Sequence, residues 1–216
     1  MLKIDELISQ LNDAITRKDW VYCIDTCFRV LYGLPETTQR ELAILMIQRY
    51  IPIFRVHWPD VGWPQEILNQ PLEWFSEHGR DVPEQPETLN PADAAFIFCF
   101  DAILNAIAHR SDLVVVTSSY MSAINVSIEA RKTNIWIADD PEGLTLWEQQ
   151  GYFPGRNADE NLAAMAVTER EWQIVRDWLS DDKHSEFFNI PDADEVEQGL
   201  ARWKDTEMSL ILPSIT

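Results

Sequence analysis

Basic residues and glycine are both scarce in this chain of 216 residues. It has 17 Lys and Arg against 36 Asp and Glu, which gives a formal net charge of −19, and only 7 Gly. An excess of acid repels phosphate backbones, so we expect no nucleic-acid binding. The few glycines form neither a phosphate-binding loop nor a G-x-S-x-G elbow. The sequence therefore contains no recognisable nucleotide-binding or hydrolase motif.

Long apolar runs and paired cysteines are also missing. No uncharged apolar stretch approaches the roughly 18–20 residues that a membrane span needs. Met1 leads into a polar, amphipathic segment rather than a basic and then apolar leader. The three cysteines, Cys23, Cys27 and Cys99, are sparse and odd in number, which is typical of free thiols in a reducing compartment. We expect a cytoplasmic protein without a membrane contact.

A metal site has little support in the sequence. Cys23 and Cys27 lie one helical turn apart, but a structural zinc site needs four nitrogen or sulfur ligands in recognisable pairs. The four histidines are scattered and form no H-x-x-x-H pair: His57, His78, His109 and His184. We expect Cys23 and Cys27 to be small buried side chains on a helix face, with no metal and no cofactor.

Helical periodicity recurs along the chain. Apolar residues follow the i, i+3, i+4, i+7 spacing over residues 4–15 and again over 20–31, on either side of Lys18 and Asp19. This pattern predicts an antiparallel helical hairpin. The chain as a whole predicts an all-α fold, as an irregular helical bundle or a short α-solenoid of about eight or nine helices. We expect residues 1–216 to form a single domain, with the core helices in 1–132.

Capping patterns suggest where other helices begin. Thr38 to Glu41 is a capping box that would open a helix toward Phe54, which Pro52 would kink or end. Thr168 to Glu171 is a second capping box, predicted to start a helix that buries Trp172. Asn90 and Pro91 predict an N-cap and first position for a long apolar helix over 91–110.

Two segments can be interpreted as helix or strand. Residues 113–116 have β propensity, yet Tyr120, Ala123, Ile124 and Ile128 keep helical spacing, which favours a helix over 113–131. Residues 134–138 could pair with 144–147 as a short β-hairpin near 135–147. A helix that starts at Asp140, with Pro141 at its first position, is the favoured alternative.

Polar residues spaced by four lie on two successive predicted helices. Asp101, Asn105 and His109 form one stripe, and the next helix carries a second: Ser118, Ser122, Asn125 and Glu129. If these helices are antiparallel, the stripes could face each other as a polar seam. Asp101, His109 and Glu129 would then be candidates for general acid–base catalysis. The simpler interpretation is that each stripe is the solvated side of its helix.

Nine tryptophans divide into two groups. Five lie at helical positions beside apolar residues and are predicted to be core: Trp20, Trp74, Trp172, Trp178 and Trp203. The other four tryptophans lie near turns. Together with nearby acidic and aromatic residues they could form a protein-binding patch: Trp58, Trp63, Trp136, Asp139, Asp140, Trp147, Tyr152 and Phe153. These rings could instead pack loops onto the domain.

The acid excess is uneven along the chain. Residues 1–132 hold 18 acids and 11 bases, a net charge of −7, whereas 133–216 hold 18 acids and 6 bases, a net charge of −12. The C-terminal part, with its loop aromatics, is therefore the most acidic region. A basic partner would be attracted to it.

Residues 40–79 resemble the Imm5-like immunity proteins of bacterial polymorphic-toxin systems. The resemblance consists of a helix that contains Arg40 and ends in Pro52 and Phe54, a Pro59-Asp60-x-x-x-Pro64 turn, and a helix that contains Trp74 and closes at Gly79. It implies an all-α fold and neutralisation of a partner toxin. It implies no catalytic residues.

The leading hypothesis is a non-enzymatic, acidic protein that binds another, basic protein, with an immunity-like role. An α-helical enzyme or small-molecule binder that uses the polar seam is an alternative. A helical scaffold, or a subunit of a homo-oligomer, is another.

Overall fold

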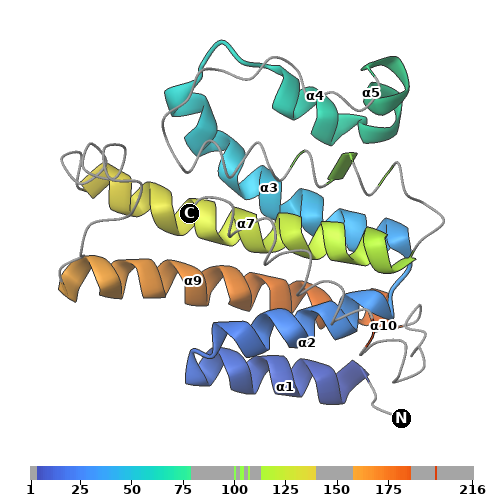
Figure 1. Cartoon of the computed structure of the whole chain (residues 1–216). Helices are drawn as coiled ribbons and strands as arrows, with labels where there is room; N and C mark the ends of the chain where they lie inside the picture. Colours follow the sequence, from blue (N-terminus) through green and yellow to red (C-terminus); the bar gives the residue numbers. More distant parts are fainter. Residues whose placement is uncertain are drawn as a thin grey trace.

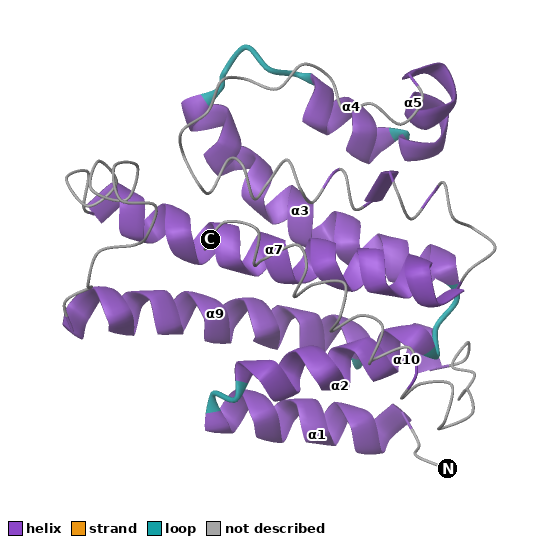
Figure 2. Ribbon diagram, viewed as in Figure 1, coloured by secondary structure: helices purple, strands orange, loops and turns teal. Residues whose placement is uncertain are grey.

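The computed structural model describes residues 4–78, 100, 103–104, 107, 113–139, 158–185 and 198. Every secondary-structure element in these ranges is helical (Figure 2). The prediction of an all-α bundle is confirmed. None of the described helices combines the length and the apolar character that a membrane span requires.

The first two helices form the predicted hairpin. They are α1 (Ile4–Arg17) and α2 (Trp20–Tyr32), and they pack against each other. Lys18 takes a left-handed conformation, with φ of 57°, which reverses the chain between them. Asp19 then caps α2, because its side chain accepts a hydrogen bond from the Tyr22 N–H at 3.1 Å.

The third helix, α3 (Glu36–His57), begins earlier and ends later than its sequence signals suggest. The capping-box prediction is wrong, because Pro35 is the N-cap and Thr38 lies inside the helix. Pro52 does not end the helix. Pro52 is exposed, while Ile51 and Phe54 beside it are buried, so burial on both sides of the proline offsets the hydrogen bond that it removes.

Two short helices follow the predicted turn. They are α4 (Trp63–Asn69), with Pro64 in its first turn, and α5 (Pro71–His78), which starts at a proline. Their inward faces bury Ile67, Leu68 and Trp74. In Figure 1 they lie along the edge of the bundle opposite α1, and α4 packs on α3 and α5.

The long helix α7 (Leu113–Asp139) includes residues 113–116 and 134–138, the two stretches that the sequence left open between helix and strand. Residues 113–116 are helical, as favoured. Residues 134–138 are also helical, so the alternative of a strand at 134–138 is wrong, because α7 continues through them to Asp139. The remainder of the suggested hairpin and the helix expected from Asp140 lie outside the described residues. Of the helix predicted over 91–110, the structure describes four helical, buried residues: Phe100, Ile103, Leu104 and Ile107.

The last elements are α9 (Ala158–Leu179) and α10 (Asp182–Ser185). The second capping-box prediction is wrong, because α9 begins ten residues before Thr168. Thr168 and Glu171 are instead buried on the same side of α9 as Trp172 and Val175. Their spacing is that of a core-facing stripe.

Helix α7 is the centre of the bundle. It lies between α3 and α9 in Figure 1 and also packs against α2, while α1 packs on α2 and α9. Its buried side chains include Val116, Tyr120 and Met121, and the half-buried Val114 and Val126 on the flanks of this face also pack against the core. A helix with neighbours on several sides has this distribution, whereas a surface helix has one apolar stripe.

Candidate functional site

The polar seam is only partly described. Ser118, Ser122 and Asn125 are half-buried along α7, and Glu129, one turn further on, is exposed. Asp101, Asn105 and His109, the other half of the seam, lie outside the described residues. The structure therefore describes one stripe of the expected pair.

Among the predicted binding aromatics, Trp58 and Trp63 are half-buried and pack against the core. The Trp63 ring meets Phe100 edge-on, with centroids 5.2 Å apart and an interplanar angle of 76°. Part of each ring is thus used for packing. Trp136 and Asp139 belong to α7, and Asp140, Trp147, Tyr152 and Phe153 lie outside the described residues.

The most unusual polar group of the described part is Glu171 of α9, an acidic side chain that is only 1% exposed. Arg49 of α3 holds both of its oxygens: Arg49 Nε donates to Oε2 at 2.7 Å and Nη2 donates to Oε1 at 2.8 Å. This bidentate contact is among the strongest pairings that a carboxylate makes with a side chain. It joins two helices whose paired residues are 122 positions apart.

A second guanidinium approaches the same carboxylate from α7. Arg131 Nε lies 3.1 Å from Glu171 Oε1, and Arg131 Nη1 donates to the backbone carbonyl of Arg49. One buried carboxylate therefore joins α3, α7 and α9. Burial of an ion is costly unless it is paired, and here the pairing is complete on the carboxylate side.

The two arginines differ in electrostatic environment. The hydrogen bond to Glu171 is the largest cause that raises the pKa of Arg49 above its ordinary value. Burial is the largest effect on Arg131 and lowers its pKa; Glu171 opposes this, and the charges of Arg49 and Arg170 add to the lowering. The Glu171 carboxylate thus favours the charged form of both arginines, and burial is the largest effect on the pKa only at Arg131.

Sequence reasoning missed this cluster. The capping-box pattern predicts that Glu171 lies in the first turn of a helix, although it shares one helix face with buried residues: Thr168, Trp172, Val175 and Leu179. A carboxylate within such an apolar stripe is a signal for a buried ion pair. Its partners lie on helices distant in sequence, so spacing within one helix does not identify them.

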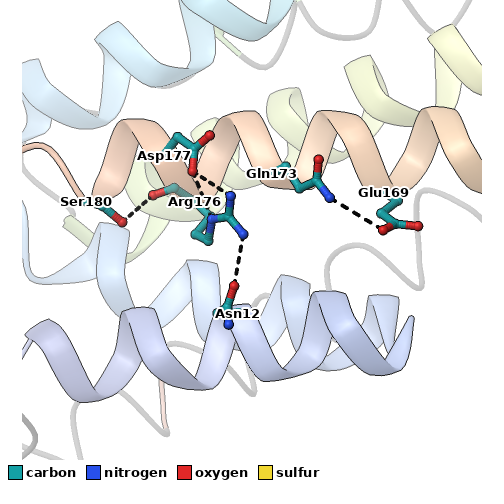
Figure 3. Close-up of polar contacts among 6 residues, drawn as sticks. All are labelled: Asn12, Glu169, Gln173, Arg176, Asp177 and Ser180. Atoms are coloured by element: carbon teal, nitrogen blue, oxygen red, sulfur yellow. Dashed lines mark hydrogen bonds and ion pairs between the residues drawn. The ribbon is translucent and has the colours of Figure 1, made fainter.

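The exposed side of α9 carries separate polar contacts (Figure 3). Arg176 Nη1 donates to Asn12 Oδ1 of α1 at 2.9 Å, and Arg176 Nη2 donates to Asp177 Oδ1 at 2.7 Å. Lys18 pairs with Glu169 at 3.6 Å. Because these groups are solvated, each pair stabilises the fold by only about 0–1 kcal/mol.

Cys23 and Cys27 are both free and fully buried, as expected. Burial is the main cause that raises the pKa of Cys23 from 9.0 to about 12. The negative charge of Asp19 raises it further, and the positive charge of Arg17 lowers it by less. Burial also raises the pKa of Cys27. These thiols are protonated and inert rather than nucleophilic. No group of three or more His, Cys, Asp or Glu in the described ranges is arranged to hold a metal ion.

We expect alkylation of the peptide that carries Cys23 and Cys27 at about pH 8 to be on the order of 10³ slower in the native protein than in urea, because burial suppresses the thiolate. Mass spectrometry of that peptide measures the rate. Native labelling at the unfolded rate would show that the thiols are accessible.

The raised pKa of Cys23 contributes stability that is present below about pH 9 and is lost as pH rises toward 12.

A purely acidic surface lies on residues 58–78, which we call the acidic lobe. Its four acids, Asp60, Glu66, Glu73 and Glu77, are all exposed, and the segment contains no Lys or Arg. Leu72 is 39% exposed among them. Arg55, near the end of α3, contacts the lobe through Gln65 at 3.4 Å.

Comparisons of the chain with protein families, with curated proteins and with solved structures find no match.

Proposed function

We propose that the chain is a non-enzymatic cytoplasmic protein that binds a basic partner protein through the acidic lobe. The observation that carries this proposal is the segregation of charge in the described part. The lobe presents four exposed acids without a Lys or Arg of its own. Outside the lobe, several arginines and lysines of the described part pair with acids, as Arg49 does with Glu171, Arg176 with Asp177 and Lys183 with Asp181.

The lobe also has an apolar component suited to an interface. Leu72 is exposed between the acids, and Trp58 and Trp63 are half-buried at the start of the lobe. Partly exposed tryptophan and leucine can be covered by a partner, while the surrounding carboxylates select a cationic surface and accelerate encounter. The predicted patch of Trp136, Asp139, Asp140, Trp147, Tyr152 and Phe153 would extend this chemistry.

The resemblance to Imm5-like immunity proteins spans residues 40–79, which include the acidic lobe. It supports an immunity-like role, in which the partner is a toxin. Toxins that attack nucleic acid are often basic, so an acidic inhibitor could cover a cationic active site. This role needs no catalytic group on the inhibitor.

The test is affinity capture from native lysate with matched charge variants. In the lobe variant, Glu66, Glu73 and Glu77 become Gln; in the control variant, the exposed acids Asp5, Asp13 and Glu41 become Asn, Asn and Gln. Both variants remove three negative charges from −19. We expect recovery of the basic partner to fall about tenfold in the lobe variant and less than about twofold in the control.

Raising the salt concentration should release the partner from the wild-type chain, because exposed charges are screened within about 10 Å at 0.1 M salt. Equal losses in the two charge variants would mean that net charge alone attracts the partner. Capture that is insensitive to salt and to both variants would contradict the proposed function.

A further inference from the structure

We draw no further inference here: the strongest candidate, the exposed surface patch of Val21 and Tyr22 in the first turn of α2, with Arg17 over the Tyr22 ring, carries none because nothing among the described residues shows what covers it.

Discussion

Replacement of Glu171 by alanine is expected to lower the free energy of unfolding by about 3–5 kcal/mol, because it leaves two partly buried guanidinium groups without their counterion. The side chains of Arg49 and Arg131 are only 26% and 21% exposed, so water replaces the lost carboxylate incompletely. Urea denaturation followed by circular dichroism measures the change. A total stability of about 5–15 kcal/mol is ordinary, so the loss would be a large share of the free energy of unfolding.

Glu169→Ala is the matched control for this change. Glu169 is on the same helix and pairs with Lys18 at 3.6 Å, but both side chains are substantially exposed. We expect a loss below about 1 kcal/mol. A similar loss in the two variants would show that Glu171 does not act as a buried ionic contact between helices.

The second large effect is expected at Trp172. Its side chain is 1% exposed and is among the largest that are fully buried in the described part. Truncation to alanine removes its apolar contacts and leaves a cavity in α9, the helix that packs on α7 and α1. We expect Trp172→Ala to lower the free energy of unfolding by about 3–5 kcal/mol.

Trp172→Phe and Trp58→Ala serve as comparisons. Phenylalanine keeps most of the buried ring area, and Trp58 is only half-buried, so both losses should be smaller than that of Trp172→Ala. The urea concentration at which half of the protein is unfolded ranks the variants, provided that the slope of the unfolding free energy against urea is the same for each. A larger loss at Trp58 than at Trp172 would mean that the lobe, rather than α9, carries more of the packing energy.

Where local periodicity and tertiary packing agree, the sequence predicted the structure well. The apolar spacing on either side of Lys18 and Asp19 predicted the hairpin of α1 and α2. These signals act within a few residues of one another. They do not depend on which helix lies next to them in space.

Where the two disagree, packing prevailed. Thr168 and Glu171 fit a capping box, yet their positions on a core-facing stripe place them inside α9. Thr38 fits a cap as well, but Pro35 starts α3 instead. The charge cluster was beyond prediction for the same reason, since Arg49, Arg131 and Glu171 meet only when three helices have packed together.

The most direct test of the proposed function is zero-length carbodiimide cross-linking of the chain to its captured partner, followed by mass spectrometry. This chemistry joins a carboxylate to an amine only where the two are in contact. We predict that cross-links run from Glu66, Glu73 or Glu77 of the acidic lobe to lysines of the partner, and that they disappear at high salt. Cross-links confined to acids outside the lobe, such as Asp5, Asp13 or Glu41, would contradict binding through the acidic lobe.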